Sequence, residues 1–200
     1  MANGSEDNSP VKVLRFIKLS EYIRPVFYSN RLVAPFPTHL LSLHRFNRPQ
    51  GIMTKAEMRT DKGTMTIEFF EKDAPKTVEN FVSLAKKGFY NGITFHRVIP
   101  NFMIQGGDPT GTGAGGPGYT IPCELTGDNQ YHDRGVLSMA HRGRNTGGSQ
   151  FFICHNRQNT QHLDRNHTVF GKVVEGLDVI DQIRQGDKIQ EVKILEDEQA

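Results

Sequence analysis

Residues 95–108 hold the side chains whose types and spacing best suit a binding or catalytic site. Arg97 lies there among apolar residues, and its guanidinium stays charged, so removing it from water is costly unless it gains partners. Phe102 and Gln105 follow closely and add an aromatic surface and an amide. A cation, an amide and an apolar wall together could bind a neutral, partly apolar ligand that carries a carbonyl. The alternative is a strand whose arginine simply extends to water.

Two short strands are expected in this segment, at residues 94–99 and 102–105, joined by a turn at Pro100 and Asn101. Proline presets φ for a turn, and asparagine tolerates the left-handed conformation beside it. The turn would bring the arginine, the apolar side chains and the amide into one neighbourhood.

The elements that must position this hairpin begin after Met53. Strands are expected at 56–60 and 64–70 around a glycine-containing loop. A helix should follow, with Asp73 as N-cap, Pro75 in its first turn, apolar residues at helical spacing from Val78, and a stop at Gly88. Further strands are expected at 135–140, 150–154, 169–174 and 189–195, and a second short helix at 177–184, with Val179, Ile180 and Ile183 inward.

About eight short strands with two helices argue against a doubly wound sheet, in which strands and helices alternate. The pattern favours a mainly β fold: a closed eight-stranded antiparallel barrel capped by two α-helices. Closure would also remove exposed sheet edges.

Composition and charge narrow the function classes. The 200 residues carry a net charge of +2, and residues 1–52 hold seven Lys or Arg against three acids, a net of +4, which leaves −2 for residues 53–200. A net negative main domain is not expected to present the basic surface that binds nucleic acid. The two cysteines, Cys123 and Cys154, are too few for a disulfide scaffold, and Cys154 follows an apolar run typical of core.

Residues 1–52 differ from the main domain, 53–200, because prolines interrupt every apolar patch. No run approaches the roughly 18 apolar residues that span a bilayer, and the acidic start argues against a secretory signal, which begins with a basic region. We expect a basic, disordered leader ahead of a natural start at Met53, and therefore a cytoplasmic protein that binds no membrane. An arginine-rich, acid-poor stretch leaves two alternatives open for the leader: organelle targeting and a nucleic-acid role.

Several motif matches do not predict a site. Residues 113–118 match G-x-G-x-x-G, but Pro117 and another extended segment follow where a dinucleotide site requires a helix. The eight histidines show no paired metal-ligand spacing, and Ser138 and Ser149 lack a nucleophile-elbow pattern. We therefore expect no cofactor, no metal and no hydrolytic activity.

Four segments resemble the cyclophilins, which are peptidyl-prolyl cis-trans isomerases: 95–100 (FHRVIP), 102–108 (FMIQGGD), 137–140 (LSMA) and 145–153 (NTGGSQFFI). The resemblance extends from about residue 55 to 195 and does not cover the leader. It implies the same capped barrel, and a monomeric enzyme that assists protein folding by acting on proline-containing peptides and on unfolded or folded client proteins.

The resemblance also implies residue roles. Arg97 would be the catalytic cation, acting with Phe102 and Gln105. The substrate would be bound by a larger set: Met103, Gly113, Ala140, His141, Gln150, Phe152, His162, Leu163 and His167. A proline-peptide binding module with little turnover is the alternative, but pure binding would not need the arginine beside the ring.

The chain departs from the family pattern in three ways, one of which is two extra residues between Cys154 and His162. His141-Arg142 stands where many relatives have Asn-Ala, and His162 stands where many have Trp. The resemblance implies that this tryptophan binds the cyclic peptide cyclosporin, so we expect weak cyclosporin binding. These changes affect ligand preference more than chemistry.

Overall fold

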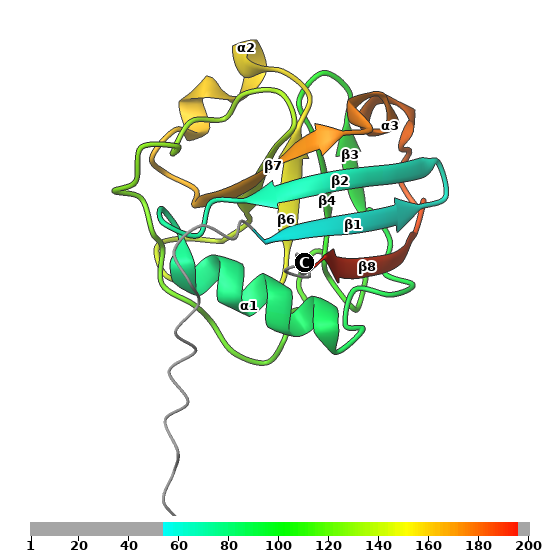
Figure 1. Ribbon diagram of the computed structural model, residues 1–200, viewed down its shortest axis with the longest axis horizontal. Coiled ribbons are helices and arrows are strands. Elements are labelled where there is room, and N and C mark those ends of the chain that lie inside the picture. Colours follow the sequence, from blue (N-terminus) through cyan, green and yellow to red (C-terminus); the bar gives the residue numbers. More distant parts are fainter. Residues whose placement is uncertain (1–53, 196–200) are drawn as a thin grey trace, which may run out of the picture. The chain divides into compact units, whose positions relative to one another are not determined.

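The structure is a computed structural model that describes residues 54–195; the expectations for residues 1–52 lie outside this range. Eight strands form one antiparallel sheet in the order β3-β4-β6-β5-β7-β2-β1-β8 (Figure 1). The strands are β1 (Lys55–Thr60), β2 (Gly63–Phe69), β3 (Arg97–Ile99), β4 (Met103–Gly106), β5 (Val136–Met139), β6 (Phe151–Cys154), β7 (Val169–Glu175) and β8 (Ile189–Leu195). The expected eight-stranded antiparallel architecture is confirmed.

The sheet curls strongly, and its two edge strands meet through the segments that precede them. Thr94, just before β3, forms an isolated bridge with Lys188, just before β8. Backbone hydrogen bonds from Phe95 N to Asp187 O and from Ile189 N to Ile93 O, both 2.8 Å, extend this junction. The edges are therefore linked through these flanking segments, while β3 and β8 themselves form no ladder. The predicted strand 94–99 accordingly begins as a strand only at Arg97.

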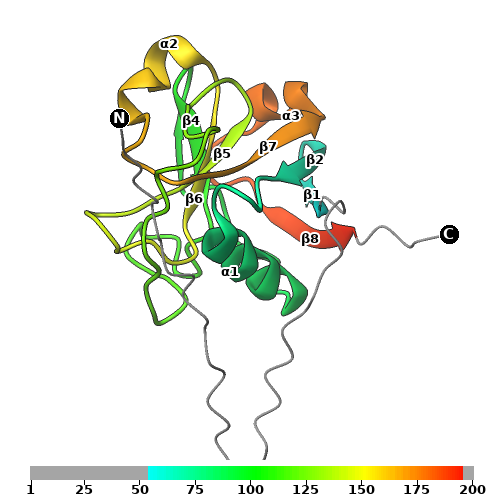
Figure 2. The same ribbon diagram turned by 60° about the vertical axis from the view of Figure 1, so that its left-hand side comes forward.

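Helices α1 (Pro75–Lys86) and α3 (Leu177–Gln182) lie at opposite ends of the curled sheet in both views (Figures 1 and 2), and buried side chains of both belong to the same apolar core. In α3, Val179, Ile180 and Ile183 are buried as expected. The helix is shorter than predicted because Ile183 already has extended backbone, with ψ of 136°. Gly88 has φ of 69°, the left-handed conformation that suits a stop after α1.

The predicted N-cap of α1 was wrong. Ala74 holds that position without a side-chain cap, and Asp73 instead accepts a hydrogen bond from the backbone N of Asn129 at 2.6 Å. Glu124, far away in the chain, accepts from Lys76 N at 3.1 Å and from Thr77 N at 2.8 Å. A carboxylate supplied by a distant loop thus satisfies the free N–H groups and favours the positive end of the helix dipole.

One helical segment was not predicted at all. Helix α2 (Arg157–Thr160) is a single turn, and the 3₁₀ turn η1 (Gln161–Leu163) follows it. The side chain of Asn156 caps α2 by accepting from Asn159 N at 3.0 Å. This asparagine was the available sequence signal, because Asn is a strongly preferred N-cap residue.

Successive residues of the strands belong alternately to two apolar clusters on opposite faces of the sheet. In β4 and β6, Ile104, Phe151 and Ile153 belong to the main core, which packs against α1. Met103 and Phe152, on the other face, belong to a second cluster with Val136, Cys154 and Val169. Successive strand residues point to opposite faces, so the same two strands build the core and the surface behind it. The site described next lies on this second face.

Cys154 is fully buried, as expected of a core residue, and burial raises the pKa of its thiol to about 12. Within residues 54–195, no helix is both long enough and apolar enough to cross a membrane. The same residues contain no group of three or more potential metal ligands.

Candidate active site

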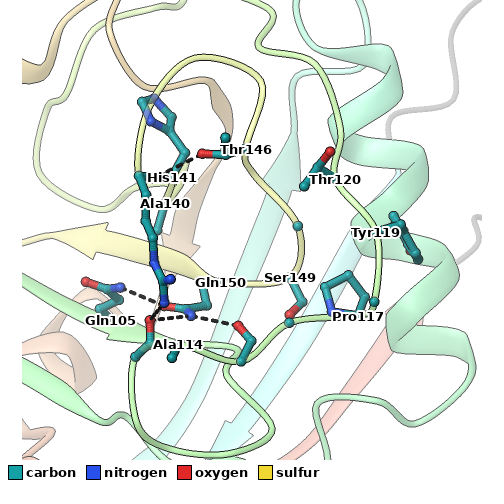
Figure 3. A pocket seen from close by; sticks show the side chains of 16 residues that line it. Gln105, Ala114, Pro117, Tyr119, Thr120, Ala140, His141, Thr146, Ser149 and Gln150 are labelled. Atoms are coloured by element: carbon teal, nitrogen blue, oxygen red, sulfur yellow. Dashed lines mark hydrogen bonds between the residues drawn. The ribbon is translucent and has the colours of Figure 1, made fainter.

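Arg97 is held by a chain of amide groups. It lies directly opposite Gln105 in the β3–β4 pair, and its Nη1 donates to Gln105 Oε1 at 3.2 Å. Gln105 Nε2 donates in turn to Gln150 Oε1 at 3.0 Å (Figure 3). Gln150 Nε2 donates onward to the carbonyls of Gly113 and Gly115, at 3.0 and 2.8 Å. These hydrogen bonds link Arg97 through two amides to the backbone, so its side chain, although exposed, has a defined orientation.

The second face carries a cavity of about 600 Å³ beside Arg97, which we call the apolar cavity because Phe102, Met103, Phe152 and Leu163 in its lining belong to or pack against the second apolar cluster. Ten of the residues predicted to form the site line it: Arg97, Phe102, Met103, Gln105, Gly113, Ala140, His141, Phe152, Leu163 and His167. Sequence reasoning missed three further lining residues, His96, Thr112 and Gln185. His162 is absent from the lining of this cavity; its ring stacks on that of Phe102, with centroids 5.8 Å apart.

The floor of the apolar cavity is rigidly supported from below. Met103 and Phe152 are almost fully buried. The ring of His132 stacks on Phe152 at a centroid distance of 5.7 Å, and that of His167 meets Phe152 edge-on at 5.5 Å. Close packing on both sides fixes the position of the Phe152 ring.

His132 was not predicted, since no motif marks it. It is fully buried, with Nδ1 at 3.2 Å from Asp164 Oδ1 and Nε2 at 2.9 Å from Ser138 Oγ. Arg157 in turn binds Asp164 through Nη2 at 2.6 Å. Burial lowers the pKa of His132 to about 4 and outweighs the opposing effect of Asp164. The imidazole is therefore neutral near pH 7 and serves as a hydrogen-bonded support for Phe152.

Two further imidazoles stack at the edge of the apolar cavity. The rings of His141 and His167 lie 4.0 Å apart and nearly parallel. His141 Nε2 lies 2.9 Å from the carbonyl of Asn166, and His167 Nδ1 lies 3.1 Å from that of Met139. Burial and, next, the neighbouring His141 lower the pKa of His167. An uncharged His167 suits the edge of an apolar cavity.

A second cavity of about 440 Å³ adjoins the first, and we call it the glycine-rim cavity because residues 113–116 form part of its wall. The two cavities share Gln105, Gly113, Ala140 and His141. Figure 3 shows Gln105 and Gln150 at one end of it and Pro117 and Tyr119 along the opposite wall. Residues 113–116 thus lie next to the apolar cavity.

Asp108 holds the glycine-rich rim in place. Its carboxylate accepts from Thr110 N at 2.8 Å and from Gly113 N at 2.6 Å. Burial alone would raise the pKa of Asp108, but hydrogen bonds, led by those from Thr110, outweigh it and lower the pKa to about 2. A permanently ionised Asp108 therefore fixes the backbone that receives the Gln150 amide.

Comparison with known proteins identifies this arrangement. The family model for cyclophilin type peptidyl-prolyl cis-trans isomerases matches residues 55–199. A peptidyl-prolyl cis-trans isomerase of Synechococcus elongatus is 60% identical over 147 residues, which cover 72% of this chain and 99% of that protein. The chain belongs to the cyclophilin family. This cyclophilin is a peptidyl-prolyl cis-trans isomerase.

Other relatives agree. A peptidyl-prolyl cis-trans isomerase of Helicobacter pylori (strain ATCC 700392 / 26695) is 57% identical over 139 residues, covering 68% of this cyclophilin and 84% of the relative. A crystal structure of a Cryptosporidium parvum cyclophilin superposes with a TM-score of 0.66 at 32% identity and covers 73% of this chain and 99% of that one. A second structure of that protein, in the presence of the dipeptide ala-pro, gives a TM-score of 0.62 at 33% identity.

Proposed function

We propose that this cyclophilin rotates X-Pro bonds by holding the proline ring in the apolar cavity while Arg97 stabilises the twisted amide. Rotation must break amide resonance, with a barrier of about 18–20 kcal/mol. No bond is cleaved, so the reaction needs neither a nucleophile nor a proton shuttle. As the bond twists, the prolyl nitrogen becomes pyramidal and gains a lone pair that can accept a hydrogen bond.

A donor aimed at that nitrogen stabilises the twisted state more than either planar state, which is the condition for catalysis. The Arg97 guanidinium has five N–H donors. Within the described residues it makes one hydrogen bond, to Gln105. The remaining donors are available to the substrate. The fixed position of this guanidinium beside an apolar cavity is the observation that carries the proposal.

One hydrogen bond from Arg97 supplies too little free energy for the full rate gain, so the cavity must contribute as well. One well-placed donor supplies about 2.7–4 kcal/mol by analogy with oxyanion holes. A rate gain of about 10⁵ requires near 7 kcal/mol, at 1.36 kcal/mol per tenfold. The remainder would come from Phe102, Met103, Phe152 and Leu163 clamping the ring while the preceding carbonyl turns, with Gln150 holding the flanking peptide.

We further propose that the substrates are proline-containing segments of unfolded or folded client proteins, and that the enzyme acts as a monomer in the cytoplasm without nucleic-acid or membrane partners. Cyclosporin should bind weakly, because His162 offers less apolar area than a tryptophan. The relative that was crystallised in the presence of ala-pro supports a dipeptide-sized proline ligand.

Two assays with the full chain test this function. One follows cis-to-trans conversion of a proline tetrapeptide, and the other follows refolding of a protein whose slow phase is limited by an X-Pro bond. The proposal predicts catalysis in both. Peptide binding without acceleration of either reaction would favour the binding module, and acceleration of the peptide alone would remove folding clients from the proposal.

A further inference from the structure

The glycine-rim cavity contains one fully charged side chain, that of Arg142. Its other lining residues are glycines, small or hydroxyl-bearing residues, amides, Tyr119 and His141, and none is a carboxylate. Figure 3 shows the imidazole of His141 turned away from the other labelled side chains, consistent with its contact to the Asn166 carbonyl. The charge that a ligand meets in this cavity is therefore that of Arg142.

Arg142 is fixed in place, yet its charge is not neutralised. Its Nη2 donates to the carbonyl of Gly113 at 2.8 Å, and its backbone N donates to Thr146 Oγ1 at 3.0 Å. The residue is exposed, and within residues 54–195 no carboxylate forms an ion pair with it. A guanidinium has five N–H donors, so several remain for a ligand after the bond to Gly113.

The position of Arg142 relative to the reaction follows from shared residues. Gly113 lines both cavities, and its carbonyl accepts hydrogen bonds from Arg142 and from Gln150, which connects through Gln105 to Arg97. A peptide whose proline occupies the apolar cavity must continue beyond it, and the adjoining glycine-rim cavity can receive a neighbouring side chain.

We propose that Arg142 makes this cyclophilin selective for proline substrates with an acidic side chain within three residues of the proline. The inference rests on the proposed function, since it takes the apolar cavity as the proline site. An ionised Asp or Glu side chain in the glycine-rim cavity would receive charge-assisted hydrogen bonds from the free donors of Arg142. A lysine there would meet a like charge with no carboxylate in the lining to offset it.

The expected preference is moderate because the site is open to solvent. Ion pairs at exposed positions contribute little, and a well-formed charge-assisted bond contributes more. We expect kcat/KM for the best-placed glutamate peptide to exceed that for the matching glutamine peptide by about three- to tenfold, and the lysine peptide to rank lowest. Added salt should reduce the preference, since exposed charges are screened.

The test uses the full chain and proline peptides that carry Glu, Gln or Lys at each of three positions on either side of the proline. Isomerisation rates are measured by NMR exchange, so that no coupling protease contributes its own specificity. Arg142→Gln keeps a donor for the Gly113 carbonyl but removes the charge, and should bring the Glu-to-Gln ratio close to one. Arg142→Glu should invert the preference in favour of the lysine peptide.

Arg144→Gln is the matched control, because Arg144 is an exposed arginine in the same loop that lines neither cavity. It should retain the wild-type ratio. Wild-type catalysis without any charge preference, or a preference that survives Arg142→Glu or disappears equally in Arg144→Gln, would overturn the proposal. Failure of the wild-type enzyme to accelerate even the glutamine peptides would instead contradict the underlying isomerase mechanism.

Discussion

Arg97 and Gln105 face each other across the β3–β4 pair, with Arg97 Nη1 at 3.2 Å from Gln105 Oε1. The antiparallel register, set by the turn between the strands, brings the two side chains together although they are eight residues apart in the sequence. Gln150 then fixes the Gln105 amide from the other side. The guanidinium is thus oriented by backbone register and two amides.

Replacing Gln105 with Ala should therefore lower kcat/KM about tenfold, since a hydrogen bond to a charged group is worth about 1.5–3 kcal/mol. Gln150→Ala should lower it less. The double variant should lose less than the product of the two single effects, because both act on the same chain of amides. A tetrapeptide assay on the three variants checks this. Independent, multiplicative effects would show that Gln150 does not act through Gln105.

Phe152 should matter for both binding and stability. Its ring is buried between His132 and the apolar cavity, so Phe152→Ala should cost about 3–5 kcal/mol of unfolding free energy. It should also weaken binding of a proline peptide. Denaturant melts and a peptide titration, run at a temperature where the variant is folded, separate the two effects. Full peptide affinity in the folded variant would exclude Phe152 from the proline site.

Stability should fall as the pH drops from about 6.5 to about 4. Burial depresses the pKa of His132 from its ordinary value of 6.5 to about 4, so in this range the unfolded chain binds a proton that the folded chain does not. At 1.36 kcal/mol per pKa unit, the loss is about 3 kcal/mol. The pKa values of His96 and His167 are lowered too and add to the same slope.

Urea unfolding at pH 7, 5.5 and 4.5 measures this dependence. The variant His132→Gln, although less stable, should lose most of the slope, because its side chain does not titrate. Asp108 does not interfere, since its folded pKa of about 2 lies below its ordinary value of 3.8 and its contribution is lost only at lower pH. A wild-type stability that is flat from pH 7 to 4.5 would show that His132 is protonated without cost.

Cyclosporin inhibition should depend on His162. This residue is exposed and stacks on Phe102 at the rim of the apolar cavity. Compared with tryptophan, one lost hydrogen bond of about 0.5–1.5 kcal/mol and less ring burial should together weaken the complex roughly tenfold to a hundredfold. His162→Trp should restore inhibition with little change in turnover. Equally tight inhibition of both proteins would show that His162 does not control the drug site.

Local patterns in the sequence were sufficient for most of the fold. The period of apolar residues predicted α1, and the turn at Pro100-Asn101 predicted the β3–β4 hairpin, in which Asn101 has φ of 62°. Local reasoning failed where a partner comes from far along the chain. Asp73 has the right residue type for an N-cap, but Glu124 reaches the free N–H groups of α1 instead.

The site shows the same division. Arg97, Phe102 and Gln105 form a recognisable local motif, and the resemblance supplied Phe152 and Leu163. The contact of His132 with Ser138 and the hydrogen bond from Arg142 to the Gly113 carbonyl depend on how loops pack. No spacing in the sequence reveals them. Of the residues that line the apolar cavity, Arg97, Met103, Gln105 and Phe152 lie on strands with a regular period, whereas the others lie in loops and turns that tertiary contacts position.

The central claim is that Arg97 stabilises the twisted X-Pro bond, and the most direct test is the isomerisation rate of Arg97→Ala. Arg97 is exposed and contributes to neither apolar cluster, so the variant should fold with an unchanged circular dichroism spectrum. Loss of the donor should lower kcat/KM for a proline tetrapeptide by about 10²-fold or more. Near wild-type turnover in the folded variant would contradict the mechanism.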